Sequence, residues 1–368
     1  MESSLQIGKV MGIPMRLHWS FILIIPWIAY VFSSISDQYF GLSYGFLAVD
    51  SPMLRWSYST IFAVLLFVCV ALHELGHSYV ARAHGIGIKS ITLYLFGGVA
   101  AIEDMPKNPK LELQMALAGP AISGILSLVA LLLYYESLSL LGIRHPLTIL
   151  LSTLAIVNLT LLVFNLLPAF PMDGGRVLRA WLATRMSYVA ATSIAASVGK
   201  IFAAFMFLLG LFGGGLFIII VAAFVYLGAT EEERATKINI CLEGIRVRDI
   251  MSANVHTVQP DMNLKDMTEL IFREKHRGYP VIDAQGMAGI ITSEDIKKVP
   301  EAQRESTTVA EVMTRKIFDI GPDEEAVAAM KKLTELGIRR LPVMENGQLV
   351  GILSREDLVR AMELCSQG

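Results

Sequence analysis

The chain has 368 residues, of which 54% are hydrophobic and 17% are charged, and its formal net charge is −2. This charge gives no indication of binding to nucleic acid, so we expect no nucleic-acid partner. The averages conceal a break near Thr230, because long apolar runs precede it and an ordinary charged sequence follows. The composition therefore excludes a uniformly water-soluble chain and predicts a membrane domain followed by a soluble domain.

Six hydrophobic segments are predicted to cross the membrane, and most approach the roughly 20 residues needed for this. They are residues 17–35, 57–83, 111–136, 147–167, 193–212 and 214–229. The first segment is too long for a signal peptide and lacks a convincing small-residue cleavage site. His18, at its start, is expected to be an interfacial or packing residue rather than a ligand.

The second segment contains the sequence HELGH, with histidines at positions 73 and 77. Residues four apart lie on the same face of a helix, so His73 and His77 can bind one metal ion. Glu74, beside the first histidine, can hold the attacking water. An ionised side chain in the middle of a membrane helix costs about 2.5–3.5 kcal/mol, so three ionisable residues indicate a function there. The motif predicts hydrolytic zinc chemistry inside the membrane.

Two local features lie between this motif and the fourth segment. Residues 88–96 alternate partly between apolar and polar side chains and run into Gly97 and Gly98, which predicts a strand or hairpin re-entering the membrane. Its edge could accept an extended substrate by strand addition, or the element could only close the cavity. In the third segment, Gly119 and Gly124 predict close helix packing.

The fourth segment ends in the sequence NLLPAFPMDGGR, residues 165–176, which breaks the helix and supplies a carboxylate. A hydrolytic zinc normally takes three protein ligands, so we predict Asp173 as the third ligand. The alternative is that Asp173 caps the next helix. Glu103 and Asp104 are rivals, but their polar loop suggests solvated side chains. Asn165 can donate a hydrogen bond to the substrate, or it can hold the broken helix together.

The distribution of Lys and Arg predicts a cytoplasmic N-terminus, and six spans would return the C-terminal part to the cytoplasm. The predicted cytoplasmic set is Lys9, Arg16, Arg82, Lys89, Lys107, Lys110, Arg176, Arg179 and Arg185, against Arg55 and Arg144 on the far side. At a rise of about 1.5 Å per residue, the two histidines lie about 15 and 9 Å from the helix end at Ala83. The metal would therefore sit inside the bilayer, nearer the cytoplasm.

From Val247 onward the sequence repeats with a period of 62 residues and no gap, so that Pro260 corresponds to Pro322. Each unit is predicted to contain a helix, two short strands joined by a turn, and a final helix. We place the membrane domain at residues 1–230, a linker at 231–246, and the two repeated units at 247–305 and 306–368.

Together these motifs resemble the site-2 protease family of intramembrane zinc metalloproteases, in the branch with a C-terminal pair of cystathionine-β-synthase (CBS) domains. The resemblance implies a polytopic α-helical membrane domain, with six spans and a short re-entrant β element, and a cytoplasmic α/β tandem CBS module. It implies an endopeptidase in the cell membrane that cleaves transmembrane segments of other membrane proteins. In this family the equivalents of His73, His77 and Asp173 bind zinc. The equivalent of Glu74 is the catalytic acid/base, and the equivalent of Asn165 contributes to the part of the active site that faces the substrate.

The resemblance to CBS domains also suggests a regulatory ligand. In such modules a hydroxyl residue and an Asp three positions later hold the phosphate and ribose of an adenine nucleotide such as AMP or ATP. The matching residues are Thr292 with Asp295 and Ser354 with Asp357. The alternative is that both pairs only cap helices. Paired CBS modules also suggest a homodimer.

Two other functions were weighed against a protease. A CBS-regulated transporter or channel could use the His and Asp side chains as an ion path, but it has no need of Glu74 within HELGH. A catalytically silent scaffold is expected to have lost a ligand or Glu74, and all are present. The intramembrane protease is therefore the preferred interpretation.

Overall fold

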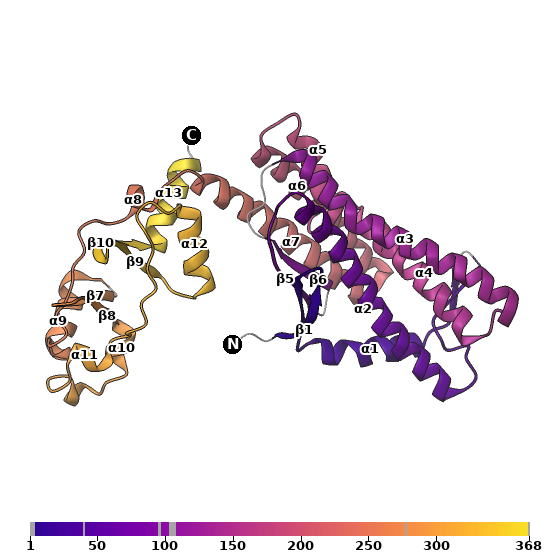
Figure 1. Cartoon of the computed structure of the whole chain (residues 1–368), viewed down its shortest axis with the longest axis horizontal. Helices are drawn as coiled ribbons and strands as arrows, with labels where there is room; N and C mark the ends of the chain where they lie inside the picture. The colour runs from indigo at the N-terminus through magenta and orange to yellow at the C-terminus, as the bar shows by residue number, and fades with distance from the viewer. Residues whose placement is uncertain (1–3, 40, 95–96, 103–107, 277, 367–368) are drawn as a thin grey trace. The chain divides into compact units, whose positions relative to one another are not determined.

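The computed structural model describes residues 4–39, 41–94, 97–102, 108–276 and 278–366. It divides into two compact units, Met1–Arg234 and Ala235–Gly368 (Figure 1). The first unit is mainly helical. Its helices are α1 (Phe21–Ser33), α2 (Pro52–Ala83), α3 (Pro109–Leu141), α4 (Pro146–Asn165), α5 (Asp173–Ala183), α6 (Tyr188–Leu209) and α7 (Gly215–Leu242), with a π-helical turn at Gly210–Gly214 between the last two.

Within the described residues, α2, α3, α4, α7 and the stretch of α6 through Gly213 are long and apolar enough to cross a membrane. These helices confirm the predicted polytopic helical domain. The first predicted span differs, because α1 has only 13 residues and is about 20 Å long. The predicted start of this span, including His18, belongs instead to a strand.

Helices α2, α3 and α4 each begin with an N-cap side chain followed by proline, which explains where each helix starts. Ser51 accepts a hydrogen bond from Leu54 N, Asn108 from Leu111 N, and His145 from Leu147 N. In each case the residue after the cap is proline. Proline suits the first helical position because its ring fixes φ and the missing N–H is unpaired there in any case.

A four-stranded sheet lies beside α2, with the order β1-β2-β5-β6. Its strands are β1 (Ser4–Val10), β2 (Ile13–His18), β5 (Ile88–Tyr94) and β6 (Gly97–Ile102). The β5–β6 hairpin was predicted, although Phe96 lies outside the described residues; the β1–β2 hairpin was not. Strand β5 pairs with β2 in parallel, with Met15 opposite Ile91, and with β6 in antiparallel. Among the described strands, β6 is therefore the edge strand nearest α2, and β5 is paired on both sides.

Helix α5 is fixed by a buried cation. Arg179 is 4% exposed, and its Nη2 lies 2.5 Å from Oε1 of Glu112 in α3, which is 1% exposed. Its Nη1 lies 2.7 Å from Oε1 of Glu232 in α7, and its guanidinium lies over the ring of Phe170. A buried charge is stable only when paired in this way, so the pairing restricts how α5 sits against α3 and α7. Asp173 is the first residue of that helix.

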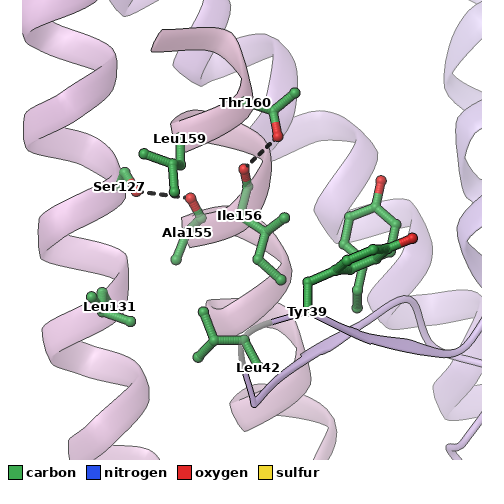
Figure 2. Close-up of a pocket in the computed structure, with 9 residues that line it drawn as sticks. Tyr39, Leu42, Ser127, Leu131, Ala155, Ile156, Leu159 and Thr160 are labelled. Atoms are coloured by element: carbon green, nitrogen blue, oxygen red, sulfur yellow. Dashed lines mark hydrogen bonds between the residues drawn. The ribbon is translucent and has the colours of Figure 1, made fainter. Parts of the chain in front are cut away.

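A cavity of about 300 Å³ lies between α3, α4 and the short hairpin of β3 (Asp37–Tyr39) and β4 (Leu42–Tyr44). Figure 2 shows its lining, with Ser127 donating to Ala155 O and Thr160 donating to Ile156 O. None of the residues that line it is a predicted site residue. The cavity is separate from the candidate metal centre described below.

The second unit contains the predicted duplication (Figure 1). The first repeat has α8 (Val247–Ile250), α9 (Leu264–Glu274), β7 (Gly278–Asp283), β8 (Gly286–Thr292) and α10 (Ser293–Lys297). The second has α11 (Val309–Val312), α12 (Ala326–Glu335), β9 (Arg340–Glu345), β10 (Gln348–Ser354) and α13 (Arg355–Ser366). Gly278 pairs with Thr292, and Arg340, 62 residues later, pairs with Ser354. Most of the segment predicted as a linker, residues 231–246, is helical, because α7 continues through Leu242.

The two repeats exchange their first helices. Val247 of α8 lies in the hydrophobic core of the second repeat, with Leu341. Val309 of α11 lies in the core of the first repeat, with Tyr279. All four side chains are fully buried. Each core therefore contains one helix from the other repeat, although the sequence period alone suggests two consecutive units.

Candidate metal centre

Three potential ligand atoms from two helices converge at one point. Nε2 of His73 lies 3.1 Å from Nε2 of His77, and each of these atoms lies 3.2 Å from Oδ2 of Asp173. Ligands bound tetrahedrally to zinc at about 2.0–2.1 Å are about 3.3 Å apart. Two imidazoles and one carboxylate also suit zinc better than calcium or magnesium, which prefer oxygen ligands. The residues therefore fit a zinc ion.

Both imidazoles are oriented by α3. His77 Nδ1 donates to Met115 O at 2.7 Å, because a carbonyl oxygen can only accept; this leaves Nε2 of His77 free to bind a metal. His73 Nδ1 lies 2.9 Å from Oγ of Ser123, which is fully buried. Such partners hold metal-binding imidazoles in position. Sequence reasoning missed both, since a backbone carbonyl and a single serine give no pattern.

Gly119 provides the space for this centre. A Cβ atom at Gly119 would lie 2.2 Å from Nε2 of His77 and 2.6 Å from Nε2 of His73, closer than real contacts allow. On the facing helix, a Cβ at Gly76 would lie 2.9 Å from Ala118 O. The glycine within HELGH thus lets α2 approach α3. The sequence predicted close packing at Gly119 but not its place beside the imidazoles.

Asp173 contacts the imidazoles rather than capping its own helix. The N-cap of α5 is Met172, which makes no side-chain capping bond, whereas Oδ2 of Asp173 lies against both histidines. The rivals Glu103 and Asp104 lie outside the described residues. Among the described residues, Asp173 is therefore the carboxylate that completes this set.

Glu74 lies beside the set and against the open strand. A Cβ atom at Gly98 of β6 would lie 2.4 Å from Cγ of Glu74 and 3.3 Å from its Oε1. Only a residue without a side chain leaves room there for the carboxylate. The carboxylate thus lies next to a strand whose outer edge is unpaired within the described residues.

Both parts of the chain match known protein families. The model of peptidase family M50 matches residues 61–141 and 142–209, and the CBS domain model matches 247–301 and 309–364. A zinc metalloprotease of Methanocaldococcus jannaschii is 36% identical over 365 residues, covering 99% of this chain and 97% of the relative. The chain belongs to the M50, or site-2 protease, family.

This site-2 protease has other relatives. Rip3 of Mycobacterium tuberculosis is 33% identical over 381 residues, covering 99% of this chain and 94% of Rip3. A solved site-2 protease from Methanocaldococcus jannaschii is 40% identical, with a TM-score of 0.45, covering 63% of this chain and 95% of that one. The predicted family, the combination of a helical membrane domain with a CBS pair, and the metalloprotease activity are confirmed.

Asn165, the other predicted catalytic residue of the protease, lies at the end of α4. Its Nδ2 donates to Leu161 O at 3.0 Å, one turn earlier in the same helix. This bond agrees with the alternative in which Asn165 holds the end of the broken helix. Its role toward the substrate stays a prediction.

The four predicted nucleotide residues form two equivalent helix caps. Thr292 Oγ1 donates to Oδ2 of Asp295 at 2.6 Å, and Asp295 N donates back to Thr292 Oγ1 at 3.4 Å. Ser354 and Asp357 repeat this pair at 2.6 and 3.2 Å. Burial alone would raise the pKa of Asp295, but hydrogen bonds from Thr292 and Lys298 outweigh it and lower that pKa. Asp295 is therefore an ionised acceptor at neutral pH.

Proposed function

We propose that this metalloprotease binds one zinc ion through His73, His77 and Asp173 and cleaves transmembrane segments of membrane-protein substrates within the bilayer. The observation that carries the proposal is the triangle of ligand atoms 3.1 to 3.2 Å apart, in which both histidines belong to α2, a helix long and apolar enough to cross a membrane. Helix α2 ends at Ala83, so the histidines lie about 15 and 9 Å from its end. The reaction would take place away from bulk water.

The protein's own residues supply the proton transfers. Zinc bound at the three ligands would polarise the scissile carbonyl and lower the pKa of water toward about 7. Glu74 then takes the proton of the attacking water and delivers it to the leaving amine. Met115 O holds the proton on Nδ1 of His77, which keeps the other ring nitrogen available. Asn165 would donate a hydrogen bond to the substrate carbonyl or oxyanion after leaving Leu161 O.

The substrate would be held in an extended conformation along β6. A transmembrane helix hides its peptide bonds within its own hydrogen bonds, so it must unwind locally before attack. The interior strand β5 cannot accept another strand, because it already pairs with β2 and β6. The outer edge of β6 can, and Gly98 brings that strand against Glu74. This favours substrate contact over a sheet that only closes the cavity.

Removal of zinc tests the proposed activity. Detergent-purified protein incubated with a single-span membrane protein is expected to produce two fragments, detected by gel electrophoresis and mass spectrometry. A chelator should stop the cleavage, and added zinc should restore it; the same chelator saturated with zinc beforehand is the control. Cleavage that continues at the same rate in the chelator would contradict the proposal that zinc is required.

We propose that the N-terminus and the CBS pair face the cytoplasm, with domains at 1–230, 247–305 and 306–368. This orientation rests on the excess of Lys and Arg at one set of span ends. The side chain of Arg82, near the end of α2, donates to Met11 O in the β1–β2 turn, which brings the N-terminal hairpin to the same end. A homodimer through the CBS pair stays a prediction.

We also propose that AMP or ATP binds the CBS pair at Thr292 with Asp295 and at Ser354 with Asp357, and regulates cleavage. The ionised Asp295 can accept ribose hydroxyl bonds, and both pairs lie at equivalent helix starts. In full-length protein, nucleotide at 100 times its Kd should stabilise the CBS unit by about 2.7 kcal/mol. The Asp295→Asn variant should lose most of the shift in melting temperature, and the exposed Asp261→Asn should keep it. No shift in the native chain would contradict nucleotide binding.

A further inference from the structure

A second group of metal-binding side chains lies in the first repeat, outside the protease centre. His256 precedes β7, Glu274 ends α9, and His276 follows it, and their ligand atoms lie within 4.8 Å of one another. Nδ1 of His256 lies 3.0 Å from Oε2 of Glu274. The two imidazole rings are 5.5 Å apart, against 4.9 Å for His73 and His77. Both imidazoles are exposed, so small rotations can bring the three ligand atoms to one ion.

A buried tyrosine holds the carboxylate of this group. Tyr279 is fully buried, and its hydroxyl donates to Oε2 of Glu274 at 3.3 Å. Hydrogen bonds of this kind orient the carboxylate ligands of metal ions.

The second repeat provides an internal comparison, because each position has a counterpart 62 residues later. His256 corresponds to Phe318, Glu274 to Leu336, His276 to Ile338 and Tyr279 to Leu341. Leu341 is in the core of the second repeat, and Phe318 and Ile338 pack against it. The backbone is the same at this point, since Lys275 and its counterpart Gly337 both have positive φ, 61° and 64°.

All four polar side chains of the first repeat are thus replaced by apolar ones in the second. The fold of the repeat does not require them, since the second repeat forms the same elements with apolar residues. A surface ion pair would account for His256 and Glu274, and the hydrogen bond to Glu274 satisfies the hydroxyl of Tyr279, but neither contact accounts for His276. A common ligand accounts for the whole set.

We propose that His256, Glu274 and His276 bind a divalent transition-metal ion of the zinc class in the first CBS repeat, with Tyr279 positioning the carboxylate. Two imidazoles and one carboxylate are the same donor types as in the protease centre, and they select zinc, cobalt, nickel or copper over calcium and magnesium. Solvent-exposed imidazoles leave a coordination position for water. The site is independent of the proposed proteolysis, because it shares no residue with the protease centre.

Metal content of the full-length, untagged protein tests this site. The protein is stripped with a chelator, reloaded with Zn²⁺, passed through gel filtration and analysed by mass spectrometry of the metal. We expect two zinc ions per chain in the native protein. We expect one zinc ion per chain in the repeat-two variant, in which the three ligands are replaced by their counterparts in the second repeat (His256→Phe, Glu274→Leu and His276→Ile). We also expect one zinc ion per chain in the double variant His73→Ala, His77→Ala, which lacks the protease centre. A repeat-two variant that holds as much zinc as the native chain would overturn the proposal.

A single isosteric substitution serves as a second test, because the triple variant could lose zinc by misfolding. Glu274→Gln should reduce the content from two zinc ions to one without changing the melting temperature of the stripped protein. Glu269→Gln, at an exposed position of the same helix, should leave two. In the His73→Ala, His77→Ala background, Co²⁺ should produce the visible absorption of a nitrogen-ligated ion, and Glu274→Gln should remove it. Two zinc ions in Glu274→Gln, or a cobalt spectrum that it leaves unchanged, would reject the site.

Discussion

Replacement of Glu74 with Gln is expected to reduce the cleavage rate by about 10²–10⁴-fold, the usual contribution of a general acid–base group. Gln has the same shape and still fits against Gly98, but its amide cannot take the proton of water. The zinc content should stay at the native level, because Glu74 is not in the triangle of ligand atoms. The measurement is the initial rate of cleavage of a single-span substrate, with metal content determined on the same sample.

Glu136→Gln is the matched control for this change. Glu136 is exposed on α3, so its replacement should leave the rate within a factor of about two, in line with the small effects of surface substitutions. His73→Ala, in contrast, should lose the zinc ion of the protease centre and the activity together. A Glu74→Gln protein that holds zinc and cleaves at the native rate would refute the acid–base role, even if the protease activity itself stands.

Replacement of Gly119 with Ala is expected to remove both the zinc ion of the protease centre and the activity, although none of the three ligands is replaced. The added methyl group would lie 2.2 Å from Nε2 of His77 and 2.6 Å from Nε2 of His73, so at least one imidazole must turn away. Even changes outside the ligand shell lower metal affinity by about 10–100-fold, and a displaced ligand should cost at least as much. Zinc titration by calorimetry and the cleavage assay both report the effect.

Gly124→Ala on the same helix separates this effect from a general loss of helix packing. A Cβ atom at Gly124 would lie 3.4 Å from Cδ2 of Leu162, which is an ordinary contact. This variant should bind zinc and cleave substrate like the native protein. If Gly119→Ala also did so, the arrangement of α3 beside the two histidines would be wrong.

The residues most visible in the sequence were those whose chemistry conflicts with their surroundings. Three ionisable residues in an apolar helix, and one carboxylate where another helix breaks, were enough to predict His73, Glu74, His77 and Asp173. The structure brings the two histidines and Asp173 together. The supporting residues Met115, Ser123 and Gly119 could not be predicted, because their contribution depends on how α3 packs across α2.

The fold could be predicted to a similar extent. The long apolar helices and the 62-residue repeat follow from hydropathy and self-similarity, and the structure contains both. The β1–β2 hairpin was missed, and the last two residues of β2, Leu17 and His18, were assigned to the first span because β2 leads into the apolar residues of α1. The continuation of α7 beyond Thr230 was missed because charged residues can extend a helix outside the membrane.

The exchange of α8 and α11 makes the two CBS repeats a single cooperative unit. A fragment that contains only residues 247–305 would lack Val309, and a fragment with only 306–368 would lack Val247, so each would expose an incomplete core. Such halves cannot melt independently, and any ligand that tightens one repeat also stabilises its neighbour. An ion or nucleotide bound to the first repeat therefore also stabilises the second repeat against unfolding, even where the second has no equivalent ligand-binding side chains.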